Sequence, residues 1–400
     1  MEAREWLVSK DVIAKSKKAY AHFDWRTDIG QQREYISVPE NISHHAFYPF
    51  IHYQQKIVKY QKDVGKKPPK VRDICYAAHI DRCIFQFYSF QLNNLYNERV
   101  KRDGIDGVAI AYRTDLGGSN ITFSKQAFDF IRRNAPCYVM IGDFTGFFDN
   151  LDHQYLKRQW CSLLGERFLP EDHYAVFRNV THYSKWERSD LLKLNGLPDT
   201  KEGVKLLNKK SAVLTKEQFQ QNRSHIITHP DPFGIPQGSP ISAVLANVYM
   251  LEVDKKINDM VRAVGGMYMR YSDDFIVVLP EQQEGDSAKA LEQVVALVQE
   301  TPRLELQPSK TQYFHFANNT LVNCGNRFHA DADCSKRFIN FLGFTFDGNK
   351  ISIRSKTTGK YYYRMYRKAR GIVKQGGYTP EGKHISGKKL YETYSKKGAK

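Results

Sequence analysis

The chain has 400 residues, of which 41% are hydrophobic, and it carries a formal net charge of +17. This hydrophobic content allows a large folded core and excludes a chain that is disordered throughout. The excess of Lys and Arg over Asp and Glu points to a polyanionic partner, most often a nucleic acid. The longest apolar runs, such as Phe275–Leu279, have the length of a strand. We therefore expect no membrane-spanning segment and no membrane partner.

The positive charge is concentrated near the C-terminus. Residues 350–400 contain fifteen Lys or Arg and two acids, Glu381 and Glu392. The six cysteines form no Cys-x-x-Cys pair and show no tight disulfide spacing. Free thiols are typical of a reducing compartment, and the start of the chain lacks the apolar core of a signal peptide. We therefore expect a cytoplasmic protein. Its C-terminal eighth should supply much of the positive charge that binds an anion.

The first third of the chain is expected to be mainly helical. Helical stretches are expected around Trp6–Tyr20 and Phe50–Gln61. Gly65–Lys70 combines a glycine, two prolines and lysines, which is typical of a boundary between parts of a chain. A long amphipathic pattern then predicts a helix over Val71–Glu98. A Gly-rich segment follows, with a short strand near Val108–Tyr112.

The middle of the chain alternates between helices and a short apolar strand. A helix is expected around Ser124–Arg133, followed by a strand over Cys137–Ile141 and a helix from about Asp152 to Leu164. Residues 184–232 are polar, show no strong period and resemble an insertion. Apolar residues along Ser239–Val261 form a wide face, which predicts a buried helix.

The remainder predicts an α+β arrangement. Two apolar strands, Gly266–Tyr271 and Phe275–Leu279, flank a tight turn, and a helix over Asp286–Glu300 follows. This order of elements predicts an antiparallel sheet under two helices. Further strands are expected at Leu304–Leu306, Tyr313–Phe316 and Phe338–Phe346.

Three aspartates are candidate metal ligands. Asp143 follows the strand that begins at Cys137, and Asp273 and Asp274 lie on the turn between two apolar strands. Adjacent carboxylates at a buried turn repel each other, and a divalent cation relieves that repulsion. Carboxylate oxygens suit Mg²⁺, and such a set can hold two ions. The alternative is an ordinary solvated Asp-Asp turn.

A second possible metal set lies near residue 330. It consists of Cys324, His329, Asp331 and Cys334. Their spacing matches no common zinc site, so the pattern favours a polar loop.

Seven segments, in the same order along the chain, resemble the motifs of reverse transcriptases. The resemblance spans about residues 70–350 and rests on Tyr271-Ser272-Asp273-Asp274 above all. The other segments are Arg72 with Asp81-Arg82, Ala111-Tyr112-Arg113, Asp143-Phe144-Thr145-Gly146-Phe147-Phe148-Asp149, Gly234-Ile235-Pro236-Gln237-Gly238-Ser239-Pro240-Ile241-Ser242, Pro308-Ser309-Lys310-Thr311 and Phe341-Leu342-Gly343-Phe344.

The resemblance implies a right-hand polymerase fold of the α+β class. It implies an N-terminal extension over residues 1–66, fingers over 67–142 and a palm over 143–349 that contains the insertion at about 184–232. The basic segment 350–400 then corresponds to a short α-helical thumb. The implied activity is RNA-directed DNA polymerisation from dNTPs.

The resemblance also assigns catalytic roles. Asp143, Asp273 and Asp274 would hold two Mg²⁺ ions, or Mn²⁺, with the backbone carbonyl of Phe144 as a further oxygen ligand. Two such ions polarise the α-phosphate and activate a 3′-hydroxyl. Lys310 would donate a proton to pyrophosphate, and its alternative is a surface turn lysine.

Four residues are expected to bind the incoming dNTP. Arg113 offers a planar fork for the triphosphate, and a bulky Phe148 under the sugar excludes a 2′-hydroxyl. Gln237 and Gly238 allow the nucleotide close to the backbone. The alternatives are a core position for Phe148, a solvated loop position for Arg113 and a simple helix start for Gly238.

Primer and template contacts are expected from the C-terminal part of the resemblance. Basic side chains contact phosphates and aromatic rings stack on bases or sugars. The alternative is a solvated basic tail. The expected contact residues are Phe341, Leu342, Gly343, Tyr362, Arg364, Arg367, Lys368 and Arg370.

The chain is most similar to compact bacterial reverse transcriptases. It has no room for an RNase H, protease, integrase or endonuclease domain, and it lacks the Asn-Ala-x-x-His and Val-Thr-Gly segments usual in retron enzymes. This favours a cytoplasmic defence-associated enzyme that copies a partner non-coding RNA in antiphage defence, with a homo-oligomer or a second protein subunit possible. The alternatives are a retron or group II intron-like enzyme and an inactive nucleic-acid-binding scaffold.

Overall fold

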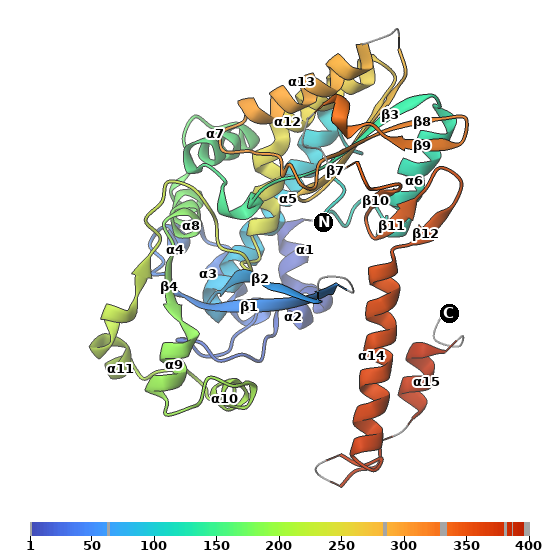
Figure 1. Cartoon of the computed structure of the whole chain (residues 1–400). Helices are drawn as coiled ribbons and strands as arrows, with labels where there is room; N and C mark the ends of the chain where they lie inside the picture. The colour runs from blue at the N-terminus through green and yellow to red at the C-terminus, as the bar shows by residue number, and fades with distance from the viewer. Residues whose placement is uncertain are drawn as a thin grey trace. The chain divides into compact units, whose positions relative to one another are not determined.

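The computed structural model describes residues 2–61, 65–282, 286–328, 334–379, 382–385 and 387–395. The fold is α+β, as predicted, and the chain divides into two compact units (Figure 1). The first unit comprises Met1–Leu116, Gly142–Val277 and Gln282–Thr311. The second comprises Gly117–Ile141, Val278–Glu281 and Gln312–Lys400. The chain therefore passes several times between the units before it ends in the second.

The first unit begins with short helices that pack around one long helix. Trp6 stacks on Phe90 of the long helix, with ring centroids 4.8 Å apart. Asp24 accepts hydrogen bonds from the backbone N–H groups of His79 and Ile80, which fixes the start of that helix. The elements are α1 (Ala3–Val8), α2 (Lys10–Ser16), α3 (Ile29–Ile36), α4 (Pro39–Ser43), α5 (His79–Arg102) and α8 (Glu171–Thr181).

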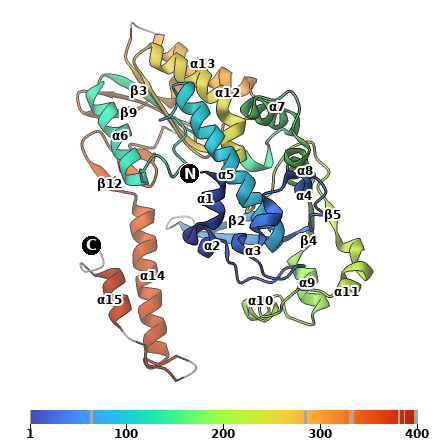
Figure 2. The same cartoon turned by 180° about the vertical axis from the view of Figure 1, so that it is seen from behind.

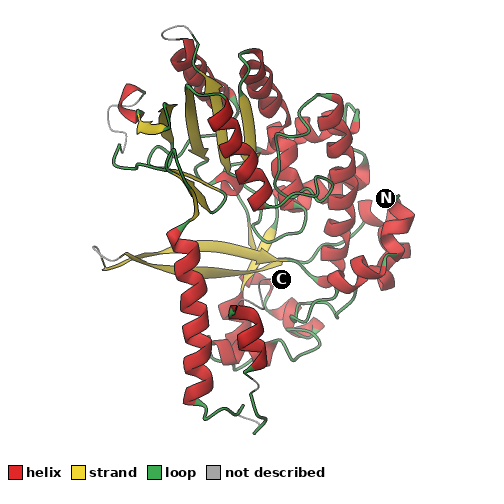
Figure 3. Ribbon diagram, turned by 90° about the vertical axis from the view of Figure 1, so that its right-hand side faces the viewer, coloured by secondary structure: helices red, strands yellow, loops and turns green. Residues whose placement is uncertain are grey.

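The expectation of a helix at Phe50–Gln61 is wrong. These residues form strand β1, which pairs in antiparallel register with β2 (Gly65–Tyr76), and the two form a long ribbon (Figure 3). The register shifts between Ile57 and Lys59, opposite Pro68 and Pro69. Since proline has no N–H to donate to a ladder, the irregularity accommodates both prolines. The expected boundary at Gly65–Lys70 is therefore part of strand β2.

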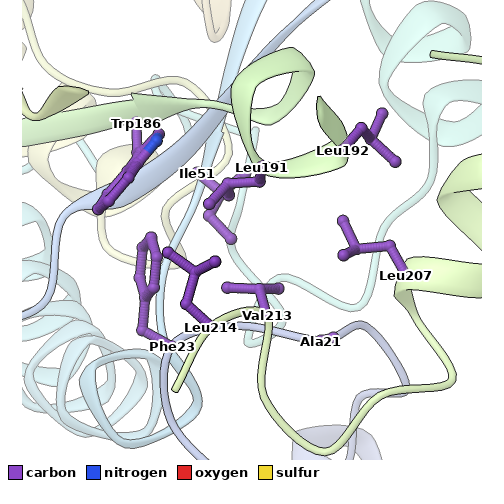
Figure 4. Close-up of a cluster of buried hydrophobic side chains, with 9 residues drawn as sticks. All are labelled: Ala21, Phe23, Ile51, Trp186, Leu191, Leu192, Leu207, Val213 and Leu214. Carbon is purple, nitrogen blue, oxygen red and sulfur yellow. The ribbon is translucent and has the colours of Figure 1, made fainter. Parts of the chain in front are cut away.

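The polar segment 184–232 is more ordered than its composition indicates. Strand β4 pairs in parallel with β1, with Trp186 opposite Ile51, in a sheet of order β2-β1-β4-β5. Buried apolar side chains from this segment gather around Phe23 and Trp186 (Figure 4). Its helices have six or seven residues, too few to show a clear period. The elements are β4 (Ser184–Glu187), α9 (Arg188–Leu194), α10 (Lys201–Leu207), α11 (Lys216–Gln221), η2 (Arg223–His225) and β5 (Ile227–Thr228).

The core helix and the hairpin that carries Asp273 and Asp274 are found where the sequence predicts them. Helix α12 (Ser242–Ala263) buries apolar residues along its whole length and packs against α5, α7, α13 and β6. The expected strand at Leu304–Leu306 is reduced to a single bridge between Phe144 and Leu306. The remaining elements here are η1 (Phe147–Asp149), α7 (His153–Leu164), β6 (Met267–Tyr271), β7 (Asp274–Pro280) and α13 (Asp286–Glu300).

Strand β3 (Cys137–Asp143) belongs to a sheet of order β6-β7-β3-β8-β9. It pairs in antiparallel register with β8 (Gln312–Ala317), Val139 lying opposite Phe314, and β8 pairs with β9 (Thr320–Asn323). This confirms the predicted antiparallel sheet. Strand β3 ends at Asp143, so the sheet itself carries that carboxylate to its edge.

The second unit holds a small sheet and the basic C-terminal helices. The expected strand Phe338–Phe346 is two strands, because Leu342 and Gly343 have φ of 48° and 91° and turn the chain. Helices α14 and α15 lie side by side (Figure 2). No helix in the described part of the chain is both long and apolar enough to span a membrane. The elements are α6 (Asn120–Arg133), η3 (Gly325–Arg327), β10 (Ile339–Phe341), β11 (Phe344–Phe346), β12 (Ile351–Ile353), α14 (Ser355–Lys374) and α15 (Lys388–Tyr394).

Candidate active site and nucleic-acid interface

The first unit brings Asp143, Asp273 and Asp274 together. The backbone N–H of Phe144 donates to the carbonyl of Asp273 at 3.1 Å, which joins the end of β3 to the turn between β6 and β7. Loss of surrounding water and the charges of Asp273 and Asp143 raise the pKa of Asp274 to about 7, although its side chain keeps contact with solvent. The Lys310 ammonium donates to the Asp143 carboxylate. The structure thus collects in one place the four groups that the sequence singled out.

These residues have the donor chemistry for a divalent cation. Three carboxylates face one ammonium group, so negative charge is in excess, as the raised pKa of Asp274 reflects. The bridge between Phe144 and Leu306 is made by the flanking N–H groups of Thr145 and Gln307, so the Phe144 carbonyl takes no part in those bonds. In the described part of the chain no three His, Cys, Asp or Glu side chains are already arranged as ligands of one ion. Lys310 instead neutralises Asp143, and a cation at this place would compete with its ammonium.

A buried arginine holds the turn that carries Asp273 and Asp274. Arg270 has no exposed surface, and its guanidinium donates twice to Asp254, at 2.9 and 2.6 Å. Another of its N–H groups donates to the backbone carbonyl of Ser272 at 3.0 Å, within the turn itself. Because Ser272 has a φ of 60°, this bond stabilises a backbone conformation that is otherwise unfavourable. Our sequence reasoning missed this arginine, although a lone charge inside the apolar strand Met267–Tyr271 was a signal for it.

Phe148, Gln237 and Gly238 are also brought together. The carbonyl of Phe148, in η1, accepts from the N–H of Ile235 at 2.9 Å, and the Gln237 amide donates to Asp149 at 3.1 Å. Gly238 has a φ of 109°, and a Cβ there would lie 2.6 Å from the carbonyl of Cys75 in β2. Only glycine fits this close approach of two backbones. Three of the four predicted dNTP residues therefore lie close together in the first unit, next to strand β2.

Arg113 is differently placed from these residues. Its side chain has no exposed surface and forms ion pairs with Asp106 and Asp115, both at 2.6 Å. A role in binding the triphosphate stays a prediction and requires these ion pairs to open. Its neighbour Tyr112, with a φ of 65°, shares a hydrogen bond with the Ser272 hydroxyl at 2.9 Å. Tyr112 is thus a contact of the catalytic turn that the sequence reasoning did not identify.

The second unit presents a basic and aromatic helix. Helix α14 contains seven Lys or Arg and no acid, and none of its residues is buried. Its tyrosines Tyr361, Tyr362, Tyr363 and Tyr366 have between 42% and 64% of their surface exposed. Such exposure costs free energy unless a partner covers the rings, so the helix face is suited to bind another molecule. The predicted contact residues Tyr362, Arg364, Arg367, Lys368 and Arg370 are all exposed on this helix.

The hairpin of β10 and β11, which carries Phe341, Leu342 and Gly343, is separated from α14 by the single strand β12. Phe341 is buried, whereas Leu342 and Gly343 form its half-buried turn. The Gly343 carbonyl accepts from the N–H of Arg354 at 3.0 Å, which ties the turn to the start of α14. Of the possible zinc set, His329 and Asp331 lie outside the described residues, while Cys324 is buried and Cys334 exposed.

One known protein family matches the sequence of this chain. Residues 64–346 match the family described as reverse transcriptase (RNA-dependent DNA polymerase). No curated protein matches the sequence. The match covers more than half of the chain and includes every residue of the candidate active site.

Solved structures of telomerase resemble the fold distantly. Apo telomerase from Candida tropicalis, truncated from the C-terminal domain, is 11% identical, with a TM-score of 0.45 over 82% of this chain and 61% of that one. Telomerase from Candida albicans in complex with a TWJ fragment of telomeric RNA is 13% identical, with a TM-score of 0.40 over 82% and 49%. The chain thus spans about three fifths or less of the length of these proteins. Likenesses at this level carry no conclusion about activity or partners.

Proposed function

The chain belongs to the reverse transcriptase family, and from this premise we propose that it is an RNA-directed DNA polymerase that adds dNTPs by two-metal catalysis. One observation carries the proposal. The bond from the Phe144 N–H to the Asp273 carbonyl brings Asp143, Asp273 and Asp274 together, and loss of surrounding water together with the charges of Asp273 and Asp143 raises the pKa of Asp274 to about 7. Natural proteins keep such crowded carboxylates where they bind cations or transfer protons. Within this family, cation binding is the use that fits.

The three aspartates would hold the Mg²⁺ ions, or Mn²⁺, with the Phe144 carbonyl as a further ligand. When bound, the ions polarise the α-phosphate and lower the pKa of the primer 3′-hydroxyl. Arg270, through the Ser272 carbonyl, keeps the turn that carries Asp273 and Asp274 in position. With Asp143 engaged by a cation, the Lys310 ammonium would no longer be needed to neutralise that carboxylate and would be available to donate a proton to the departing pyrophosphate. Positioning of this kind accounts for most of the catalysis of phosphoryl transfer.

Phe148, Gln237 and Gly238 would select and seat the incoming nucleotide. Phe148 is half-buried against the ring of Phe147 at a centroid distance of 5.6 Å, so its own ring is held firmly. A firmly held ring under the sugar leaves no space for a 2′-hydroxyl. We expect Phe148→Ala to lower the preference for dNTP over NTP about tenfold, because the smaller side chain no longer excludes the extra hydroxyl. Arg113 would join the triphosphate after its ion pairs with Asp106 and Asp115 open.

The RNA template and its DNA product would be held by the second unit. The exposed arginines and lysine of α14 are suited to phosphates, and its tyrosines to sugars or bases. The turn at Phe341, Leu342 and Gly343 would contact the primer end. This assignment explains why the positive charge of the chain is concentrated after residue 350.

The biological role that we propose is antiphage defence in a bacterial cytoplasm, with a cognate non-coding RNA as template. The support is the similarity of the motifs to those of compact bacterial enzymes. A homo-oligomer or a second protein subunit is compatible with this role. Sequencing the RNA and DNA that co-purify with the protein from its host distinguishes it from a retron or group II intron-like role.

The proposed activity is tested by dNTP incorporation on a primed RNA template. We expect Mg²⁺-dependent extension by the purified chain and none by the variant with both Asp273→Ala and Asp274→Ala. A matched control combines Asp129→Ala with Asp259→Ala, which removes two acids that form i,i+4 ion pairs on exposed helix faces. Extension by the first variant at the rate of the second would refute the assignment. Absence of extension by the wild-type chain would favour the inactive scaffold.

A further inference from the structure

Two segments of the first unit are joined by a set of hydrogen bonds behind the nucleotide residues. The N–H of Gly234 donates to the Leu151 carbonyl at 2.9 Å, and Asp152 and Phe233 form an isolated β-bridge. A Cβ at Gly234, which has a φ of 90°, would lie 2.8 Å from the Asp149 carbonyl. The segment that follows Asp143 therefore lies directly against the segment that leads to Gln237.

One buried side chain, His153, takes part in this contact. Its backbone N–H donates to the Pro232 carbonyl at 3.0 Å, and its ring Nε2 bonds the Gly234 carbonyl at 2.7 Å. A carbonyl oxygen only accepts, so Nε2 carries the proton and the ring is the donor. His153 is the first residue of α7, whose N-cap Asp152 accepts from the N–H of Tyr155 at 2.8 Å. The ring is thus fixed to the start of a capped helix.

The surroundings of His153 keep its ring neutral. It is 5% exposed, and among the described residues its Nδ1 has no hydrogen-bond partner. The rings of His182 and His229 lie 5.6 and 6.1 Å away, and burial together with these neighbours lowers the pKa of His153. His229 Nε2 bonds the carbonyl of Phe233 at 2.7 Å. His229 and His153 therefore bond the backbone carbonyls of two consecutive residues, Phe233 and Gly234.

We propose that His153 is a positioning residue, which holds the Gly234–Gly238 segment at a set distance from Phe148 and thereby determines the affinity and sugar selectivity of the nucleotide site. The proposal rests on the proposed polymerase function. His153 bonds Gly234, and the next residue, Ile235, donates its N–H to the carbonyl of Phe148, the predicted sugar contact. A shift of Gly234 is therefore transmitted to Phe148 on one side and to Gln237 on the other. The aspartates receive no contact from His153, so the chemical step is left nearly unchanged.

The test compares His153→Gln with His153→Asn. The Gln amide reaches the position of Nε2 and retains a donor for Gly234, whereas the shorter Asn side chain ends near the position of Nδ1. We expect His153→Asn to raise the KM for dNTP about tenfold and to lower the preference for dNTP over NTP by a similar factor. The kcat should change less than threefold, and His153→Gln should lie near the wild type. His182→Ala removes a neighbouring ring, for which no bond to this segment is described, and serves as the control.

Two results would overturn the proposal. One is a kcat loss in both variants with KM and selectivity unchanged, which indicates a role in folding alone. The other is equal behaviour of the Asn and Gln variants. Should His153→Asn fail to fold, Gly234→Ala disturbs the same contact from the other segment, and unchanged KM and selectivity there would reject the proposal. An inactive wild-type chain instead rejects the polymerase function itself, so the two failures are distinguishable.

Discussion

The acids Asp143, Asp273 and Asp274 and the basic side chains of α14 differ in how firmly the fold holds them. Asp143 is buried, and the bond from the Phe144 N–H to the Asp273 carbonyl and the ion pair of Lys310 with Asp143 fix the positions of these groups, although Asp274 and Lys310 are themselves exposed. The arginines and lysines of α14 are exposed, and no residue of that helix is buried. A chemical step requires fixed geometry, whereas retention of a moving polyanion requires many adjustable contacts. A single substitution among the aspartates should therefore abolish nucleotide incorporation. Substitutions on α14 should weaken duplex binding step by step.

The largest effect is expected among the three aspartates that we propose as metal ligands. Asp143→Asn keeps the size of the side chain but removes its charge, and Lys310 loses its ion pair. We expect the rate of dNTP incorporation to fall by about a thousandfold or more, because the reacting phosphate loses its electrostatic stabilisation. Binding of a primed template, measured by fluorescence anisotropy, should stay within about twofold. If the rate of incorporation fell only slightly, the aspartates would not differ from α14 in their sensitivity to substitution.

A large loss of stability is expected at the arginine that supports the turn. Arg270→Gln removes the ion-pair partner of the buried Asp254 carboxylate, which keeps only the neutral Tyr268 hydroxyl at 2.8 Å, and loss of a buried ion pair in this way typically costs about 3–5 kcal/mol. Chemical denaturation measures the free energy of unfolding. The matched control is Arg33→Gln, which breaks an exposed pair with Glu34 and should cost less than about 1 kcal/mol. Equal losses in both variants would show that burial does not decide the value of these ion pairs.

A graded effect is expected on α14. The combined change of Arg364, Arg367, Lys368 and Arg370 to Gln should weaken binding of an RNA–DNA duplex roughly 10- to 100-fold. The slope of log K against log salt should fall by about one for each phosphate that the helix no longer neutralises. Since the active site is untouched, the rate at saturating duplex should stay near the wild type. If the slope of log K against log salt did not change, the duplex would not bind along α14.

A smaller, pH-dependent effect is expected from a buried histidine in the first unit. Burial lowers the pKa of His22 to about 3 from its usual 6.5. As the pH falls below 6.5 the unfolded chain binds a proton that the folded chain does not, so stability falls as pH falls from 6.5 towards 3. At pH 5 this loss amounts to about 2 kcal/mol.

The measurement compares the free energy of unfolding at pH 7 and pH 5. His22→Gln should lose about 2 kcal/mol less than the wild type between these values. His384 is exposed and follows α14 in the chain, so His384→Gln should lose as much stability between pH 7 and pH 5 as the wild type does. The same acid loss in both variants would show that His22 does not contribute to this pH dependence.

Local pattern was sufficient for the motifs and for the strongly periodic elements. Helix α12 and the hairpin of β6 and β7 were predicted from apolar spacing, and the acids Asp143, Asp273 and Asp274 from their place beside strands. Strand β1 was predicted as a helix because its residues suit either state and pairing with β2 decides between them. The segment 184–232 was underestimated because its core is completed by Phe23 and Ile51, which are more than a hundred residues away in the sequence.

The sequence by itself determined the family of the chain, the order of its catalytic motifs and the concentration of positive charge after residue 350. Each of these depends on residues that are close together in the chain. Only the tertiary structure decided which partner each polar side chain has: Asp254 for Arg270, Asp106 and Asp115 for Arg113, and the Gly234 carbonyl for His153. The physical reason is that hydrogen bonds and ion pairs act over a few ångströms in space. Distance along the chain does not reveal which groups will come within that range.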